Sequence, residues 1–304
     1  MSFSKLLRRC SRTVRLQPAK AWIVLSSLLL INIFFLYLLS AHPSPWVTKH
    51  GSFVPRGLGR GRGEGACGPL RFADPPLPVT ALASVPGSGN TWLRHLLQQA
   101  TGIMTGSMYN DSTLYTSGFP GEGVNNGSVL VVKTHSSDPE VRGQFRRAIL
   151  LLRQPHAAIL SEFHRQHGGH LGHASRQHFD EDWETFVPEE ARFWRVFNTE
   201  WLQFAGPLHI VCYEDLRHDL NSTLSKLLGF LNVPVDRKDF ECALRRSRGK
   251  FKRRDKSGRA SENHSLSEVF TRDMKRIIGE SDVKFHEELK KFYHRRSTWL
   301  DPDA

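Results

Sequence analysis

The chain has 304 residues and a net charge of +12, and its hydrophobic fraction of 39% is that of a folded protein. This composition excludes a disordered chain and an array of short repeats. The basic residues gather in segments 1–64 and 245–259, which argues against a general nucleic-acid-binding face and favours a compact polyanion such as a nucleotide, with a solvated basic loop at 245–259 as the alternative.

The first predicted element is an uncharged apolar helix at residues 21–41, AWIVLSSLLLINIFFLYLLSA. At about 1.5 Å per residue it is long enough to cross the hydrocarbon core of a bilayer, which is about 30 Å thick. Residues 1–20 contain basic residues and no acid, so the positive-inside rule places this tail in the cytosol and the rest of the chain in a lumen. We therefore expect a membrane-anchored type II protein; a cleaved signal peptide is the alternative.

Residues 42–78 are rich in Gly, Pro and Arg and show no apolar periodicity, which predicts a flexible stem. The folded lumenal domain is then expected at 79–304. Four sequons for N-glycosylation follow the apolar segment and agree with a lumenal location. They begin at Asn110, Asn126, Asn221 and Asn263.

Three cysteines follow the apolar segment, at positions 67, 212 and 242. In an oxidising lumen we expect Cys212 to pair with Cys242, which would leave Cys67 in the stem for an intermolecular bond. Two buried reduced thiols are the alternative. No spacing of Cys and His residues indicates a zinc site.

Apolar runs alternate with helical patterns along the folded part. We predict strands at 79–85, 128–134, 147–152 and 208–213, and helices at 91–100, from residue 155, and at 216–231. Continuous apolar strands alternating with helices are typical of an α/β fold, in which helices cover both faces of a parallel sheet.

The turn between the first strand and the first helix reads PGSGNTW, residues 86–92. Glycines allow a tight turn that exposes backbone N–H groups, and the positive end of the helix dipole points at the same place. The turn is therefore a candidate phosphate site. It is not a Walker A motif, because no GK[ST] follows, and an ordinary strand–helix turn is the alternative.

Polar residues follow the next two strands. Lys133 and His135 end the strand at 128–134, where they could serve as an electrostatic clamp and a general base. Arg153 ends the strand at 147–152, and Ser161 lies eight residues further along the predicted helix. An arginine is suited to bidentate phosphate contact, so this edge of the sheet is the candidate active site. Surface turns are the alternative for each pair taken alone.

In this order the segments resemble motifs of the sulfotransferase family over residues 79–295. PGSGNTW resembles the 5′-phosphosulfate loop PKSGTTW, VVKTH (131–135) the strand that carries the catalytic histidine, and LLRQPHAAILSEF (151–163) the 3′-phosphate motif. CYEDL (212–216) and FKRRD (251–255) resemble two further signatures. SVPGSGNTWLR (84–94) and HLGHASRQHFDEDWETFV (170–187) are similar to the sulfotransferase domain of WSC-domain-containing sialate O-sulfotransferases, although the chain has too few cysteines for WSC domains.

The resemblance implies a P-loop-like parallel sheet and a Golgi enzyme. Such an enzyme transfers a sulfuryl group from 3′-phosphoadenosine 5′-phosphosulfate (PAPS) to a hydroxyl of a glycan, with sialic acid as the suggested acceptor. It implies no metal, His135 as the base and Lys133 as the charge stabiliser. It also implies that the donor contacts Gly87, Ser88, Gly89, Asn90, Thr91, Trp92, Arg153, Ser161, Tyr213, Arg253 and Arg254. The ring of Trp92 would stack on the adenine or, alternatively, belong to the core.

The sequence departs from the family pattern at two positions. Gly87 replaces the usual lysine of the 5′-loop, for which Lys133 or Arg94 could substitute, and Asp255 replaces a glycine of the C-terminal loop. Two other functions therefore stay open: a non-catalytic glycan-binding member of the fold, and a P-loop kinase, for which the Walker lysine and a magnesium-binding aspartate are missing.

Five histidines lie close together at positions 164, 167, 170, 173 and 178. The glycines between them and the absence of suitably spaced acids argue against a rigid metal site. We expect a polar loop that faces the acceptor.

Overall fold

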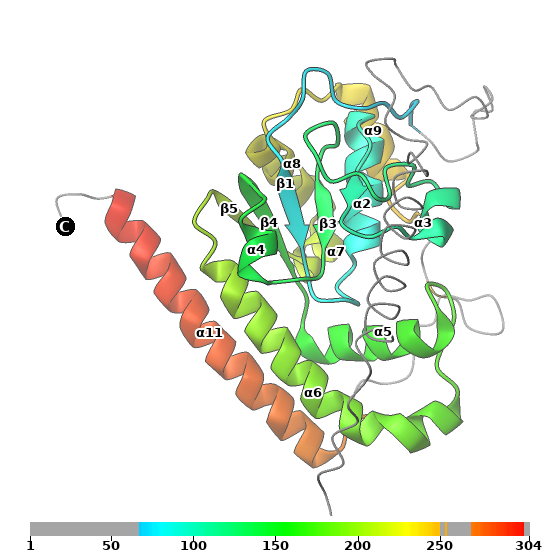
Figure 1. Ribbon diagram of the computed structural model, residues 1–304, viewed down its shortest axis with the longest axis vertical. Coiled ribbons are helices and arrows are strands. Elements are labelled where there is room, and N and C mark those ends of the chain that lie inside the picture. The colour runs from blue at the N-terminus through cyan, green and yellow to red at the C-terminus, as the bar shows by residue number, and fades with distance from the viewer. Residues whose placement is uncertain (1–66, 250–252, 254–268, 301–304) are drawn as a thin grey trace, which may run out of the picture. The chain divides into compact units, whose positions relative to one another are not determined.

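A computed structural model describes residues 67–249, 253 and 269–300, which belong to one compact unit, Arg62–Ala304 (Figure 1). The predicted cytosolic tail, the apolar segment 21–41 and most of the predicted stem lie outside the described residues, as do Arg254 and Asn263. Among the helices that are described, none combines the length and the apolar character that a membrane span needs.

The core is a five-stranded parallel sheet in the order β2-β3-β1-β4-β5. The strands are β1 Thr80–Ala83, β2 Gly106–Ser107, β3 Val132–Thr134, β4 Arg147–Leu152 and β5 Leu208–Cys212. In register, Ala81 pairs with Val132 on one side and with Ala148 on the other. The predicted α/β fold with a parallel sheet is confirmed. The strand predicted at 128–134 is shorter than expected, and β2 was not predicted.

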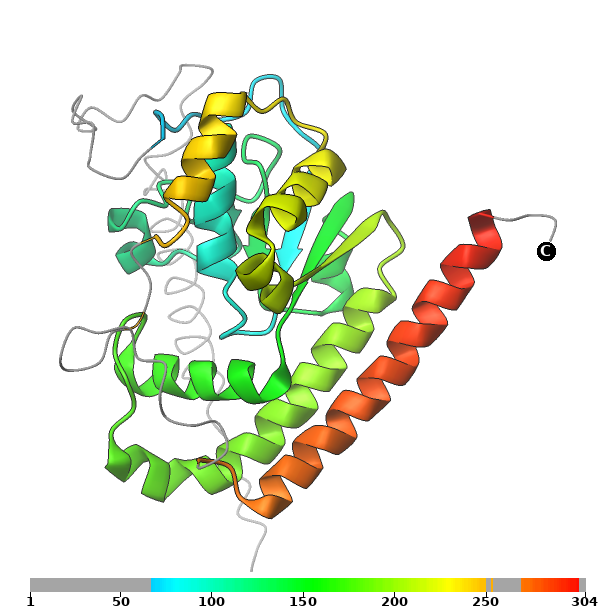
Figure 2. The same cartoon turned by 180° about the vertical axis from the view of Figure 1, so that it is seen from behind.

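Helices cover both faces of the sheet (Figures 1 and 2). The side chains of the strands alternate between two apolar clusters, one on each face. Leu82, Ile149 and Leu151 face α2 (Asn90–Thr101), α8 (Leu220–Leu231) and α9 (Arg237–Arg245) in one apolar cluster. Ala81, Ala83 and Leu150 face the other cluster. There, small alanine side chains leave room for Trp194 and Trp201 of α6 (Arg176–Leu202) and for Phe285 of α11 (Arg272–Leu300), a long helix beside α6.

Four further helices complete the described part of the fold. They are α3 Ser112–Thr116, α4 Pro139–Arg142, α5 Pro155–Gly168 and α7 Tyr213–His218. The helix predicted from residue 155 is α5, with proline at its first position, where a missing N–H costs nothing. The helix predicted at 216–231 is wrong as one element: the chain breaks at Asp219, whose carboxylate accepts a hydrogen bond from the Ser222 N–H and so begins α8.

The segment just before β1, predicted as the end of the stem, is bound to the domain. Arg71 N donates to Gly102 O and Arg71 O accepts from Met104 N, both at 2.9 Å. Leu70 and Phe72 pack against an apolar cluster. The chain therefore enters the fold before Val79.

A disulfide joins Cys67 to Cys242 of α9, with the two Cα atoms 5.7 Å apart. The predicted pairing of Cys212 with Cys242 and the alternative of reduced thiols are both wrong. The reason is tertiary: the N–H of Cys67 donates to the Gln99 side chain of α2, and α9 packs on that helix, so Cys67 lies against Cys242. Cys212 is a free thiol at the end of β5, where burial raises its pKa to about 11.

Candidate active site

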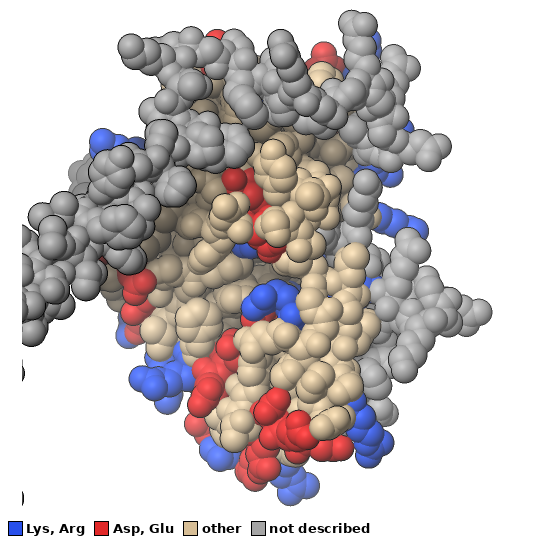
Figure 3. Space-filling view, turned by 45° about the vertical axis from the view of Figure 1, so that its right-hand side comes forward, with Lys and Arg blue, Asp and Glu red and all other residues tan. Residues whose placement is uncertain are grey.

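A cleft of about 690 Å³ lies at the carboxyl edge of the sheet. Because all five strands are parallel, the loops after β1, β3, β4 and β5 converge there, and each contributes to the lining. The hollow in the face shown in Figure 3 contains Lys or Arg side chains. The candidate residues from separate parts of the sequence therefore meet in one place.

The loop after β1 requires glycine at two positions. Gly87 has φ 78°, and a Cβ there would lie 2.4 Å from Ala158 O of α5. Gly89 has φ 92°, and a Cβ there would lie 2.7 Å from the Tyr213 ring. A side chain at either position would be strained by the positive φ and would force its neighbours to shift. The missing family lysine at position 87 thus has a structural cause: the loop backbone packs directly on α5.

The loop presents the first turn of α2 to the cleft. Gly89 is the N-cap and supplies no side-chain cap, so the N–H groups of the first turn are left for another partner. Ser88 Oγ is buried and has no hydrogen-bond partner among the described residues. Asn90 has a structural role instead. Its Nδ2 donates to Leu82 O and Ser84 Oγ, both at 3.1 Å, and these hydrogen bonds hold the loop against β1.

His135 lies at the end of β3 in the form that a general base needs. Its Nδ1 is 2.7 Å from Ser84 O, a carbonyl that can only accept, so Nδ1 carries the proton and Nε2 keeps its lone pair. Burial, and secondly the charge of Lys133, lower the pKa of His135 to about 3. The imidazole is therefore neutral over the physiological range of pH.

Lys133 is 7% exposed and lines the same cleft. Burial, followed by the charge of Arg94, lowers the pKa of Lys133. Its ammonium Nζ lies 5.5 Å from the centroid of the Tyr109 ring. A cation kept poorly hydrated in this way is suited to stabilising charge on a substrate.

Arg153 holds the loop after β1 and faces the cleft. Its Nη1 donates to Gly87 O at 2.6 Å, and its guanidinium lies 4.3 Å from the centroid of the Tyr213 ring. Its Nε is buried without a hydrogen-bond partner among the described residues. Burial lowers the pKa of Arg153. An arginine with an unpaired buried N–H in a cleft is a candidate anion ligand.

Arg253 reaches the cleft from the basic segment near the C-terminus. Its Nη1 donates to Ser161 Oγ at 2.9 Å and its Nη2 to Ser161 O at 3.0 Å. Burial, and then the charge of Arg153, lower the pKa of Arg253. Two guanidinium groups that repel each other at one edge of a cleft favour an anion between them. Its neighbour Arg254, also a candidate, lies outside the described residues.

Two aromatic rings and a backbone segment form the end of the cleft beside Gly89. Trp92 contacts Tyr213 edge to face, with the ring centroids 5.5 Å apart, and its Nε1 donates to Ser247 O at 2.6 Å. Thr91 lines the cleft beside them. Trp92 is half-buried and packs against an apolar cluster as well, so its ring serves both the core and the cleft.

Arg94 cannot replace the missing lysine at position 87. It is fully buried, donates to Glu122 Oε1 at 2.5 Å and to Thr105 Oγ1 at 3.0 Å, and lies over the Phe119 ring. Of the two substitutes considered from the sequence, only Lys133 faces the cleft. Sequence reasoning also missed Tyr109, because no motif marks the short strand that precedes it.

The five histidines between positions 164 and 178 divide between the cleft and contacts with one another outside it. His164, His170 and His173 line the cleft. His170 Nε2 is 2.8 Å from Asp111 Oδ2, whereas His167 stacks on His178. Within the described part of the chain, no three His, Cys, Asp or Glu side chains are arranged to hold a metal ion. The sequons at Asn110, Asn126 and Asn221 lie on exposed residues.

Comparison with known proteins adds independent information. Residues 78–295 match the family model described as a sulfotransferase domain. The chain is 46% identical over 181 residues to the WSCD family member CG9164 of Drosophila melanogaster, and 48% identical over the same length to the WSCD family member AAEL009094 of Aedes aegypti. Each match covers 58% of this chain and 57% of the relative, so the similarity spans less than two thirds of those proteins.

Solved structures give more distant matches. The crystal structure of mouse sulfotransferase SULT7A1 complexed with PAP is 16% identical, with a TM-score of 0.46, and the match covers 67% of this chain and 82% of that one. The sulfotransferase domain from the curacin biosynthetic pathway is also 16% identical, with a TM-score of 0.37, over 67% of this chain and 97% of that one.

Proposed function

Because the chain belongs to the sulfotransferase family, we propose that its cleft binds PAPS and transfers the sulfuryl group to a hydroxyl of a glycan. One observation carries this proposal: a neutral imidazole and a buried ammonium lie at the edge of the sheet where two arginines converge. The chemistry needs a base for the acceptor, a cation for the transferred group and a site for the phosphates.

The chain's own groups fit the donor. The N–H groups of the first turn of α2 and Ser88 Oγ suit the 5′-phosphosulfate end, because they lie at the positive end of a helix and have no side-chain cap or partner among the described residues. Arg153 and Arg253 suit the 3′-phosphate, together with Ser161, whose Oγ accepts a hydrogen bond from Arg253. Trp92 and Tyr213 offer ring faces and edges to the adenine.

The proposed reaction is an in-line displacement. A bond forms between the acceptor oxygen and sulfur, the bond between sulfur and the 5′-phosphate oxygen breaks, and 3′-phosphoadenosine 5′-phosphate (PAP) leaves. His135 Nε2 takes the acceptor proton, because Nδ1 already donates to Ser84 O. Lys133 and the first turn of α2 stabilise the charge that moves onto the leaving phosphate.

We also propose an acceptor and a cellular location for the protein. The similarity to WSCD family members and the sequence motifs support a glycan on a glycoprotein or glycolipid, with a sialic acid hydroxyl as the suggested target. The apolar segment 21–41, the basic tail before it and the sequons support a Golgi membrane protein with one span and a lumenal catalytic domain.

The test is turnover of sulfur-labelled PAPS by the full chain on a panel of sialylated and desialylated glycans. We expect label on a glycan with wild-type protein and its loss in His135→Ala, with PAP binding retained by the variant. Label transfer by His135→Ala at the wild-type rate would show that His135 is not the general base. Donor binding without transfer to any hydroxyl would favour a non-catalytic glycan-binding protein, and binding of ATP in place of PAP would favour a kinase.

A further inference from the structure

Tyr109, two residues after β2, touches both candidate catalytic residues at the end of β3. Its Oη accepts a hydrogen bond of 2.8 Å from the backbone N–H of His135. Its ring stacks on the imidazole, with the centroids 5.7 Å apart and the planes at 23°. The Lys133 ammonium lies 5.5 Å from the centroid of the same ring. Tyr109 nevertheless remains 38% exposed, so part of the ring still faces solvent.

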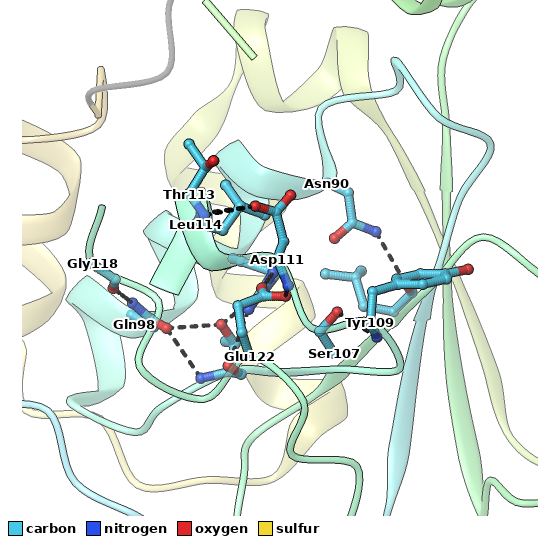
Figure 4. Close-up of polar contacts among 12 residues, drawn as sticks. Asn90, Gln98, Ser107, Tyr109, Asp111, Thr113, Leu114, Gly118 and Glu122 are labelled. Atoms are coloured by element: carbon cyan, nitrogen blue, oxygen red, sulfur yellow. Dashed lines mark hydrogen bonds and ion pairs between the residues drawn. The ribbon is translucent and has the colours of Figure 1, made fainter. Parts of the chain in front are cut away.

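A buried polar network fixes the segment that carries Tyr109 (Figure 4). The Tyr109 N–H donates to Ser107 Oγ, and its carbonyl accepts from Gly123 N at 2.8 Å. Glu122, next to Gly123, forms the buried ion pair with Arg94 of α2. Gln98 of the same helix accepts from Thr105 N and donates to Gly118 O. The contacts of Tyr109 are therefore held by the scaffold from both ends of the segment.

We propose that Tyr109 is a positioning residue for sulfuryl transfer: it orients the His135 imidazole and the Lys133 ammonium at the edge of the cleft. The inference rests on the proposed function, because the two oriented residues are the proposed base and the proposed charge stabiliser. No sequence motif pointed to it.

Three physical effects follow from the geometry. The hydrogen bond to Tyr109 Oη fixes the backbone of His135, and the hydrogen bond to Ser84 O fixes its ring. The lone pair of Nε2 therefore points in a single direction. The stacked phenol covers part of one face of the imidazole, with the ring centroids 5.7 Å apart. The same ring offers its face to the Lys133 cation, which offsets part of the cost of burying that charge.

Because of these effects, the pKa of His135 should change when the Tyr109 ring is removed. The charged groups that act on His135 are Lys133 on β3, Arg165 on α5 and Arg94 on α2. All three disfavour the imidazolium, as burial does; among the residues that the structure describes, the hydrogen bond with Ser84 favours it. Removing the phenol ring admits water and weakens the burial contribution while the three cations stay in place.

The experiment compares Tyr109→Phe, Tyr109→Ala and the matched control Tyr115→Ala, which removes a 46% exposed tyrosine from α3. We expect about a tenfold lower kcat for Tyr109→Phe, which loses one hydrogen bond, and roughly a 100-fold lower kcat for Tyr109→Ala. The affinity for PAP should stay unchanged in both, and the acid limb of kcat/KM should move to higher pH in Tyr109→Ala. Tyr115→Ala should match the wild type.

A second readout does not depend on turnover. The proton signal of His135, identified by its loss in His135→Gln, should titrate at higher pH in Tyr109→Ala than in the wild type. Wild-type kcat and an unmoved His135 pKa in Tyr109→Ala would overturn the proposal. If that variant does not fold, Tyr109→Phe carries the test, and a kcat equal to that of the wild type would overturn it. A different result would separate the two proposals. If wild-type protein transfers no sulfuryl group but the His135 titration is shifted in Tyr109→Ala, the proposed function is wrong and the contact between Tyr109 and His135 is still supported.

Discussion

The backbone carbonyl of Gly87 accepts a hydrogen bond of 2.6 Å from Nη1 of Arg153. This bond joins the loop after β1 to the end of β4, across 66 residues of sequence. Because Gly87 also packs on α5, the loop and the arginine hold each other in position before a ligand binds. A change at either residue should therefore weaken binding at both ends of the proposed donor.

Replacing Arg153 with lysine should weaken PAP binding although the positive charge remains. A lysine cannot reproduce the planar fork that contacts Gly87 O and the ring of Tyr213. We expect a loss of about 1.5–3 kcal/mol, roughly a tenfold to 150-fold weaker affinity in isothermal titration calorimetry. Arg237→Lys is the control, because this arginine of α9 has an exposed side chain, and it should bind as the wild type does. Equal affinities in the two variants would contradict the role of Arg153.

Restoring a side chain at position 87 should damage the protein. An alanine at Gly87 must adopt positive φ and place its Cβ 2.4 Å from Ala158 O. Gly118 separates the cost of the positive φ from the cost of the clash. It also has positive φ, 110°, but a Cβ there would meet nothing within 4 Å among the described residues. We expect Gly118→Ala to lose about 1–2 kcal/mol in denaturant unfolding and Gly87→Ala to lose more, together with PAP affinity. Equal losses of stability would mean that α5 does not restrict the loop.

The neutral state of His135 predicts a pH dependence of stability. Its pKa is about 3 in the folded protein, below the ordinary 6.5, so the unfolded chain binds more protons between these values. Stability should therefore fall as pH decreases from about 6.5 to 3 through this residue. His135→Gln removes the contribution, so the difference in unfolding free energy between variant and wild type should change in that window. A difference that does not vary with pH would contradict the assigned protonation state.

The disulfide should stabilise the domain, because it ties residue 67 to residue 242 over a separation of 175 residues. We expect Cys67→Ser and Cys242→Ser to lose roughly 2–5 kcal/mol of unfolding free energy, and the double variant to lose little more. Cys212→Ser is the control, because its thiol is free. Peptide mapping under non-reducing conditions identifies the pair directly, and a peptide that joins positions 212 and 242 would contradict this arrangement.

Local patterns in the sequence were enough to predict most of the sheet and the place of the cleft. The strand predicted at 147–152 coincides with β4, because a run of buried apolar residues marks it. Lys133, His135, Arg153 and Ser161 line one cleft, since parallel strands end at the same edge. The hydrophobic pattern that marks a strand or a helix lies within a short stretch of sequence, so these elements can be predicted without the tertiary structure.

Features that depend on tertiary packing could not be predicted in this way. Strand β2 has only two residues, Gly106 and Ser107, which is too short for a hydrophobic pattern. Because this strand was not predicted, Tyr109 was not recognised as a residue near the active site. The disulfide pairing depends on where residues 67–73 run along α2. The choice of Lys133 over Arg94 as the cation of the cleft depends on Glu122, 28 residues away from Arg94, which pairs with it in the interior.

Thermal unfolding of the full chain with PAP, ATP or GTP shows whether the cleft binds the phosphates of a sulfuryl donor. At about 100 times its dissociation constant, PAP should add roughly 2.7 kcal/mol to the stability of the wild type. We predict a shift with PAP alone, lost in Arg153→Ala and retained in Tyr115→Ala. No shift with PAP, or an equal shift in Arg153→Ala, would contradict the claim.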